Sequence, residues 1–315
     1  MLINLLITLY YIYLLFNLNK NKELIMEQNQ FHSMVEQLVS INHIKKIKLE
    51  ELQLNVKIGE GGQAKVFKGL YEGNQVAVKV LQNIDFKCFA HELVIIAYLE
   101  HPNIPKFYGI VFDKGILSLV FEFIDGKTLD EYKPNQFTNE QKYKMIYDLS
   151  SILEYIHKNK FIHRDLKPEN LMIDKNGKTY LIDFGIAKVC TTEDYTKTRA
   201  KGTVNYLAPE CLDPSDIDEE QIISKITTKI DVWAFGCIVS WLFSGFLPWC
   251  DKYKDNAPII QKVLSQKIPF SIPNNITDNV IRNIIQMATK VNIDERSSMA
   301  DIKVFIENNL INKMV

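Results

Sequence analysis

HRDLKPEN, at residues 163–170, is the stretch around which this sequence of 315 residues is organised. It places a carboxylate at Asp165, an ammonium at Lys167 and a carboxamide at Asn170. Two short apolar runs flank it, residues 161–162 and 171–173, and we expect both to be strand-like and to hold the loop stiffly. Such a loop can accept a proton, neutralise a phosphate oxygen and ligate a hard metal ion at one point in space. The alternative interpretation of this stretch is a polar turn between two strands.

Composition is that of an ordinary globular protein, with 47% hydrophobic and 24% charged residues. The formal net charge of −1 provides no strong field for nucleic acid or for an anionic membrane surface, so we expect no nucleic-acid partner. Five cysteines are dispersed without a CxxC spacing. This pattern argues against a disulfide framework or a zinc site and favours a reducing compartment.

The first half of the chain carries two patterns suited to binding phosphate. Residues 59–66 read GEGGQAKV between two predicted strands, and glycines there let backbone N–H groups approach phosphate oxygens. Residues 76–79 read VAVK, which places Lys79 at the end of an apolar strand, where a buried ammonium needs a counter-charge. Glu92 can supply this charge because it is the only carboxylate in the helical stretch 86–99. A surface lysine with an unrelated glutamate is the alternative.

The second half adds three short patterns at informative distances from the loop. Asp183-Phe184-Gly185 follows Asp165 by 18 residues, at the end of a predicted strand over 180–182. Ala208-Pro209-Glu210 ends 27 residues after Asp183. Asp231-Val232-Trp233-Ala234-Phe235-Gly236 opens a strongly apolar helix that we expect to run to about Phe243.

Taken in this order, the patterns resemble the signature of the protein kinase family over residues 49–310: H-R-D-L-x-x-x-N, G-x-G-x-x-G-x-V, V-A-I-K, D-F-G and A-P-E. The sequence departs from that signature at the third loop glycine, where it has Ala64. The resemblance implies an α+β, bilobal fold with a small β-rich N-lobe containing one helix, a larger α-helical C-lobe, and ATP in the cleft.

The resemblance also implies roles for individual residues. Asp165 would accept or orient the substrate hydroxyl, Lys167 would meet the γ-phosphate, and the Lys79–Glu92 pair would serve the α/β-phosphates. Asn170 and Asp183 would hold Mg²⁺. The residues expected to bind the nucleotide, with Phe121 at the back of the pocket and the backbone of Glu122 and Ile124 at the adenine edge, are Ile58, Gly59, Gly61, Gly62, Val66, Ala77, Lys79, Phe121, Glu122, Ile124, Met172 and Ile182.

Further expectations come from the same resemblance. Arg296 stands where kinases place the arginine that pairs with Glu210. Thr196 and Thr198 are candidate phosphorylation sites whose phosphates would face Arg164.

The implied activity is that of an ATP- and Mg²⁺-dependent protein serine/threonine kinase acting on protein substrates. Lys167, together with Gly202-Thr203 before Ala208, is typical of the serine/threonine type. The alternative is a catalytically weak or inactive pseudokinase that serves as a scaffold. Such proteins usually lack Lys79, Asp165 or Asp183, all of which are present here.

The N-terminus is the least determined part of the sequence. Residues 1–18 are nearly all apolar and would span about 27 Å as a helix, slightly less than the ~30 Å hydrocarbon core. They are a candidate transmembrane helix that would leave a cytoplasmic kinase domain anchored to the membrane in a single pass. A buried or interfacial helix, or an extension ahead of a start at Met26, are the alternatives.

The expected organisation is residues 1–18 as this candidate span, 19–48 as an amphipathic helical linker, and 49–312 as a kinase domain with lobes at 49–124 and 125–312. Apolar periodicity predicts helices over 27–48, 86–99, 136–159, 256–266, 277–289 and 298–309.

Overall fold

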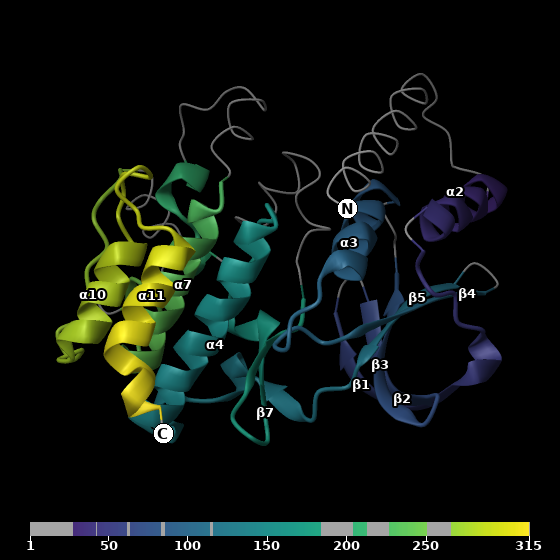
Figure 1. Ribbon diagram of the computed structural model, residues 1–315, viewed down its shortest axis with the longest axis horizontal. Coiled ribbons are helices and arrows are strands. Elements are labelled where there is room, and N and C mark those ends of the chain that lie inside the picture. The colour runs from purple at the N-terminus through teal and green to yellow at the C-terminus, as the bar shows by residue number, and fades with distance from the viewer. Residues whose placement is uncertain are drawn as a thin grey trace. The chain divides into compact units, whose positions relative to one another are not determined.

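The computed structural model describes residues 28–41, 43–61, 64–82, 86–113, 116–183, 204–212, 227–250 and 266–314. The chain divides into two compact units, residues 1–124 and residues 125–315. Strands and one central helix make up most of the N-terminal unit, whereas long helices make up most of the C-terminal unit (Figure 1). The predicted α+β class, with a β-rich first lobe and a helical second lobe, is therefore confirmed.

The N-terminal unit is built on an antiparallel sheet with strand order β1-β2-β3-β5-β4. Strands β2 and β3 form a tight hairpin whose two turn residues, Glu72 and Gly73, both have positive φ, as a type I′ turn requires. Along the sequence, helix α3 lies between β3 and β4. The bounds are β1 Leu52–Glu60, β2 Ala64–Tyr71, β3 Asn74–Leu81, α3 Phe86–Tyr98, β4 Phe107–Asp113 and β5 Ile116–Glu122.

The chain ahead of β1 contributes to the core of this unit. Helix α2, Gln28–Ile41, buries Val35, Leu38 and Val39, and the chain then turns through His43, whose φ is +53°. The Ile44 N–H donates to the Val39 carbonyl at 3.0 Å, which closes the helix in a Schellman-type turn. The helix predicted over 27–48 therefore ends at Ile41, because this left-handed turn redirects the chain.

Residues 43–48, which we call the strap, continue as extended chain beside the edge strand β4. The Ile47 N–H donates to the Ile110 carbonyl at 2.8 Å, and the Ile110 N–H donates to the Lys45 carbonyl at 3.0 Å. Ile47 is 1% exposed and belongs to the apolar cluster formed with Leu52, Tyr71, Val76, Val78, Val111 and Val120. The strap thus pairs with the otherwise open edge of the sheet and supplies part of its core.

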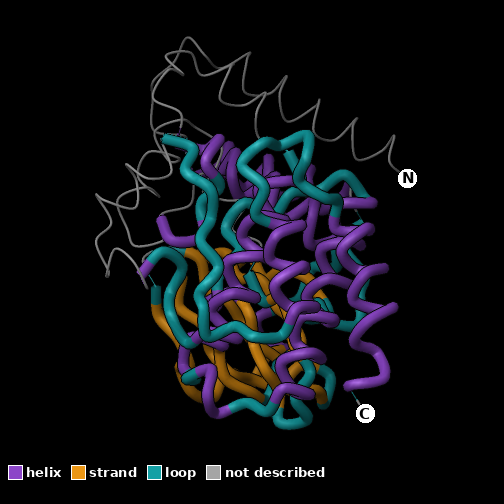
Figure 2. Tube along the Cα trace, turned by 90° about the vertical axis from the view of Figure 1, so that its left-hand side faces the viewer, coloured by secondary structure: helices purple, strands orange, loops and turns teal. Residues whose placement is uncertain are grey.

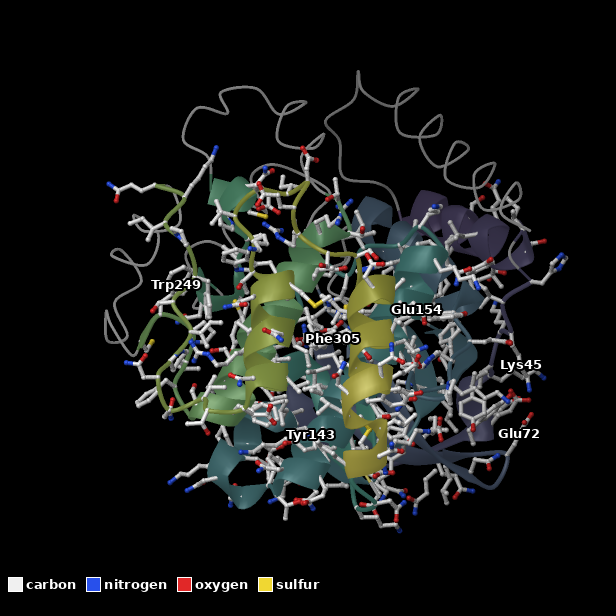
Figure 3. All side chains as sticks on the ribbon, turned by 60° about the vertical axis from the view of Figure 1, so that its left-hand side comes forward. Lys45, Glu72, Tyr143, Glu154, Trp249 and Phe305 are labelled. Atoms are coloured by element: carbon white, nitrogen blue, oxygen red, sulfur yellow. The ribbon has the colours of Figure 1, made fainter. Side chains whose placement is uncertain are left out.

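An ion pair joins the strap to the β2–β3 turn. Lys45 Nζ lies 2.7 Å from Glu72 Oε1 and 5.0 Å from the centre of the Tyr71 ring. Lys45 and Glu72 are labelled in Figure 3, where their side chains approach each other. Both side chains are more than half exposed, so the pair adds little stability by itself, and the main anchor of the strap is the buried Ile47.

The C-terminal unit is a bundle in which α4 contacts α7 and α11, and α7 contacts α10 (Figure 1). Each of α4, α10 and α11 begins with a side-chain cap, from Thr138, Asp278 and Ser298 respectively. Helix α11 runs almost to the C-terminus, as Figure 2 shows in purple. The bounds are α4 Asn139–Lys158, α7 Lys229–Ser244, α10 Asn279–Ala288 and α11 Met299–Leu310, close to the predicted ranges.

Helix α7 is the buried post of this unit, since every residue from Ile230 to Leu242 is buried. A helix that is apolar on all sides must be surrounded by protein. The approach of α10 is so close that a Cβ on Gly236 would lie 2.7 Å from the side chains of Ala288 and Thr289. The helix ends at Gly245, whose φ of +80° provides the left-handed cap.

A small antiparallel sheet, β6-β7-β8, completes the unit, and the HRDLKPEN loop leads directly into its strand β7. Its strands are β6 Gly126–Thr128, β7 Leu171–Asp174 and β8 Thr179–Leu181. Short 3-10 turns occupy Leu129–Glu131, Pro134–Gln136, Pro168–Asn170, Val204–Tyr206, Pro209–Leu212 and Ile311–Lys313, and another, Leu49–Glu51, precedes β1 in the N-terminal unit.

Within the described part of the chain, no helix is both long enough and apolar enough to cross a membrane. Residues 1–18 and the helix predicted over 256–266 lie outside the described residues. The interpretation of residues 1–18 as a membrane anchor stays a prediction from sequence.

We predict that Gly109→Ala strongly destabilises the N-terminal unit. Gly109 has φ +148°, and a Cβ there would lie 2.1 Å from the Lys45 carbonyl oxygen of the strap. The variant should lose about 2–4 kcal/mol of unfolding free energy, measured by urea denaturation. Gly73→Ala is the matched control, because Gly73 also has positive φ but has open space around it. Equal stability of the two variants would contradict the close approach of the strap.

We also predict that Tyr143→Phe has a pH-dependent effect on stability. The Tyr143 hydroxyl donates to Asp278 Oδ2 at 3.0 Å, and burial together with this bond raises the pKa of Tyr143 from 10 to about 12. Because the folded-state pKa is raised, the stabilisation is complete below pH 10 and is lost as the pH rises through 12. The variant should lose about 1 kcal/mol at pH 7, and less at pH 11. Urea unfolding at both pH values is the measurement, and a pH-independent difference would refute it.

Candidate active site

In the N-terminal unit, strand β3 and helix α3 bring Lys79 and Glu92 together. Lys79 Nζ lies 3.3 Å from Glu92 Oε1, and the Glu92 side chain is only 8% exposed. A lysine in the middle of a sheet tolerates burial only beside an opposite charge, which is why the sequence pattern anticipated this partner. The Lys79 side chain is 24% exposed, so it is only partly covered. The pair can therefore present a fixed positive charge to an anionic ligand.

The sheet face that carries Lys79 also carries other residues predicted to bind the nucleotide. Lys79 is opposite Val66 on β2, and Ala77 is opposite Phe121 on β5. The Phe121 ring lies 5.3 Å from the Phe107 ring, which closes the apolar surface on that side. The face therefore combines a small residue, bulky apolar side chains and one cation, a suitable surface for a flat apolar base joined to phosphates.

Two glycines of the glycine-rich turn, Gly59 and Gly61, could carry a side chain without a clash within the described residues. A Cβ added at Gly61 would have nothing within 4 Å, and at Gly59 the nearest atom would be Val66 Cβ at 3.7 Å. Neither glycine is therefore required by packing or by positive φ. The Gly61 N–H donates to the Ala64 carbonyl at 2.9 Å, which closes the turn. Glycine at these positions is most readily explained by close approach of a ligand to the backbone.

The segment after β5 has some backbone groups already engaged. The Glu122 N–H donates to the Lys106 carbonyl at 2.8 Å, and the Phe123 N–H donates to the Gln75 carbonyl at 3.2 Å. The Glu122 N–H is therefore not available to a ligand, and the role of the Glu122 and Ile124 backbone at the adenine edge stays a prediction.

In the C-terminal unit, Asp231 at the start of α7 holds the HRDLKPEN loop. Its carboxylate is 1% exposed and accepts hydrogen bonds at 2.8 Å from the backbone N–H groups of both His163 and Arg164. His157 Nε2 lies 2.9 Å from Asp231 Oδ2. Burial would raise the pKa of Asp231, but the bond with His157 and the charges nearby hold it below its ordinary value. The carboxylate therefore stays ionised and fixes the loop.

The first flank of the loop differs from the prediction. Residues 161–162 are not a strand, because the backbone there turns off the end of α4, where the Phe161 N–H donates to the Ile156 carbonyl. Only the second flank, residues 171–173, forms a strand, as part of β7. Rigidity at the start of the loop comes from Asp231 and not from sheet pairing.

The loop brings Asp165, Lys167 and Asn170 together as the sequence predicted. Lys167 Nζ lies 3.1 Å from Asp165 Oδ2. The Asn170 amide nitrogen donates to the Asp165 carbonyl oxygen at 2.7 Å and to its carboxylate at 3.3 Å. The side chain of Asp165 is 3% exposed and that of Lys167 is 15% exposed, so both groups are held among their neighbours.

Asp183 is tied to the same loop through two backbone contacts. The Ile182 N–H donates to the Asn170 carbonyl at 3.0 Å, and His163 Nε2 lies 2.5 Å from the Asp183 carbonyl oxygen. Because the Asn170 amide nitrogen is directed at Asp165, its side-chain oxygen is the atom left for a ligand. An amide oxygen and a carboxylate are the donors that a hard divalent cation such as Mg²⁺ prefers. The residues present therefore fit the predicted metal.

Beside the same N-terminal end of α7, Arg296 and Glu210 form a buried bidentate ion pair. The two guanidinium nitrogens donate to the two carboxylate oxygens at 2.6 and 3.0 Å. Arg296 also donates to the Lys229 carbonyl at 2.8 Å, and its guanidinium lies 5.0 Å from the Trp233 ring. The pairing expected from sequence is present, and it fixes the segment around Glu210 against α7.

Other predicted site residues have mixed outcomes. Ile58 is 47% exposed, whereas Ile124 is buried and Met172 and Ile182 are half-buried. Gly62, Thr196 and Thr198 lie outside the described residues. Sequence reasoning missed His157, and the signal that could have found it is a histidine in the last turn of the helix that leads into the loop.

Comparison with known proteins places these observations in a family. The family model for the protein kinase domain matches residues 52–305. A probable serine/threonine-protein kinase of Dictyostelium discoideum is 33% identical, over 64% of this chain and 19% of that protein. A serine/threonine-protein kinase of Arabidopsis thaliana is 31% identical, over 71% of this chain and 39% of that protein. The Aurora kinase of Saccharomyces cerevisiae is 30% identical, over 76% of this chain and 65% of that protein.

The chain thus spans less than two-fifths of the length of the first two of these relatives. The family match covers the strap-paired sheet, the HRDLKPEN loop and the helical bundle alike. This chain belongs to the protein kinase family.

Proposed function

We propose that this chain is a catalytically active kinase that transfers the γ-phosphoryl group of ATP to a serine or threonine hydroxyl of a protein, with Mg²⁺. The observation that carries the proposal is the cluster formed by Asp165, Lys167 and Asn170, held by Asp231 and joined through backbone bonds to Asp183. Phosphoryl transfer requires mainly positioning and charge neutralisation, and this cluster supplies groups for both.

Each residue of the cluster has a distinct role in the proposed reaction. Asp165 accepts a hydrogen bond from the acceptor hydroxyl, orients it and takes its proton. Lys167 donates to the transferred phosphoryl group, whose equatorial oxygens carry the charge in the transition state. Asn170 and Asp183 would hold Mg²⁺, which neutralises phosphate charge when it is bound. Asn170 additionally orients Asp165 through the bonds that its amide nitrogen makes.

The N-terminal unit is proposed to bind the nucleotide. Lys79, fixed by Glu92, donates to the α/β-phosphates, and the backbone at Gly59, Gly61 and Gly62 lies over the phosphates. The adenine ring would rest on apolar side chains, with its edge at the backbone of Glu122 and Ile124. The proposed apolar wall is Ile58, Val66, Ala77, Phe121, Met172 and Ile182.

Two features favour an active enzyme over a pseudokinase scaffold. The three groups whose loss usually marks a pseudokinase, Lys79, Asp165 and Asp183, are all present. The Lys79–Glu92 ion pair is also formed. Thr196 and Thr198 are proposed as sites at which phosphorylation would regulate the activity.

We predict that Asp183→Ala abolishes phosphate transfer. The assay measures transfer of radiolabel from γ-labelled ATP to a basic protein such as histone or myelin basic protein, in the presence of Mg²⁺. The variant should lose at least about 100-fold in rate, equivalent to about 2.7 kcal/mol of transition-state stabilisation. Asp294→Asn is the matched control, because Asp294 is an exposed aspartate in the loop between α10 and α11, and it should retain the full rate. Absence of transfer by the unmodified chain with either Mg²⁺ or Mn²⁺ would favour the scaffold.

We predict that Asp231→Asn lowers both stability and turnover. The His163 and Arg164 N–H groups each donate to a different carboxylate oxygen, and in the variant an NH2 group replaces one of these oxygens, so one N–H would face another donor. Loss of a buried charge-assisted hydrogen bond should cost about 1–3 kcal/mol in urea unfolding. The turnover number should fall at least about 10-fold because the loop is no longer held. A variant with unchanged turnover would show that Asp231 does not position the loop.

A further inference from the structure

Residues 206–208 line the same small hollow as Asp165 and Leu166, and residues of the first turns of α7 line it too. If Asp165 receives the acceptor hydroxyl, as proposed above, the polypeptide on either side of that hydroxyl passes close to this lining. The position of residues 204–208 therefore affects how a protein acceptor docks.

Asn205 fixes this segment to a second loop that is distant in sequence. Its side chain is 5% exposed, and the amide nitrogen donates to the Pro248 carbonyl at 2.9 Å. The same nitrogen lies 3.5 Å from Cys250 Sγ. Asn205 therefore contacts the residue before Trp249 and the residue after it.

Trp249 is held in a backbone conformation that it would not adopt freely. Its φ is +72°, in the left-handed region that is unfavourable for a bulky residue. The indole is 4% exposed, stacks on Trp233 of α7 at 6.4 Å and meets the Phe270 ring at 4.9 Å. Trp249 is labelled in Figure 3. Such strain persists only where the surroundings over-determine the conformation, and here these are the aromatic cluster and Asn205.

We propose that Asn205 is a positioning residue that clamps the acceptor-facing segment 204–208 to the strained loop 248–250 and thereby sets the affinity for the protein acceptor. This inference rests on the proposed kinase activity. Tyr206, next to Asn205, is buried and cannot shift without leaving the packing beside α7. The clamp therefore holds the backbone of residues 206–208 in place beside Asp165. It requires no contact between Asn205 and the acceptor.

The test compares Asn205→Ala and Asn205→Asp with the unmodified chain in steady-state kinetics. Asn205→Asp keeps the shape of the side chain but removes both N–H donors. We expect both variants to raise the KM for a basic protein acceptor at least about 10-fold, with the KM for ATP changed by less than about twofold. Asn275→Ala is the matched control: Asn275 donates to the Ser244 carbonyl at 2.8 Å, near the same loop, but it is exposed and makes no such link to residues 204–208. It should behave like the unmodified chain.

Hydrogen exchange of the backbone amides provides a readout that does not depend on activity. Removing the clamp should speed exchange in residues 204–208 and 248–250 and leave α4 and α11 unchanged. If the unmodified chain transfers phosphate but the Asn205 variants keep its acceptor KM, the clamp is overturned and the kinase activity stands. An equal rise in both KM values would indicate general damage and would also overturn the clamp. If the unmodified chain transfers no phosphate, the proposed activity fails, and unchanged exchange in the variants would refute the clamp independently.

Discussion

A single buried carboxylate, Asp231, is the constraint on which the C-terminal unit depends. An ionised group taken out of water is unfavourable unless hydrogen bonds replace its hydration. Asp231 replaces it with the backbone N–H groups of His163 and Arg164 and with His157. The loop therefore has to sit on the first turn of α7, since leaving it would expose an unpaired charge to the protein interior. The geometry of the candidate site begins from this requirement.

A chain of hydrogen bonds extends from that anchor to the candidate metal ligands. His163, held by Asp231, reaches the carbonyl of Asp183, and Asn170 reaches Asp165 through its side chain and Ile182 through its carbonyl. Most of these bonds use main-chain atoms, so they position the loop without consuming the side-chain oxygens needed for chemistry. The Arg296–Glu210 pair fixes the neighbouring segment 208–212 against the same helix, and Asn205 ties segment 204–206 to the loop 248–250 that follows this helix. One rigid helix thus orients several short irregular segments.

The sequence predicted what depends on local pattern or on obligatory charge pairing. Helices α4, α10 and α11 follow from apolar periodicity, and Glu92 could be chosen because no other carboxylate lies on α3. The contacts of His157 with Asp231 and of Asn205 with Pro248 were not predicted, because they join residues 74 and 43 positions apart and no regular spacing links the partners. The left-handed turn at His43 was missed for a related reason: it ends a helix without glycine, and apolar residues continue beyond it.

The strap shows why a family boundary and a folding boundary need not coincide. The family match begins at residue 52, yet Ile47 is buried to the same extent as Tyr71 and Val78 of the adjoining core and pairs with the edge strand β4. Removing a buried isoleucine costs about 2–5 kcal/mol in most proteins, a large part of the stability of a single domain. Gly109 of β4 has positive φ and no side chain, so the Lys45 carbonyl of the strap can lie against its backbone. A chain shortened to residue 52 would therefore lose stability in the unit that carries Lys79 and Glu92, even though every residue of the family signature would still be present.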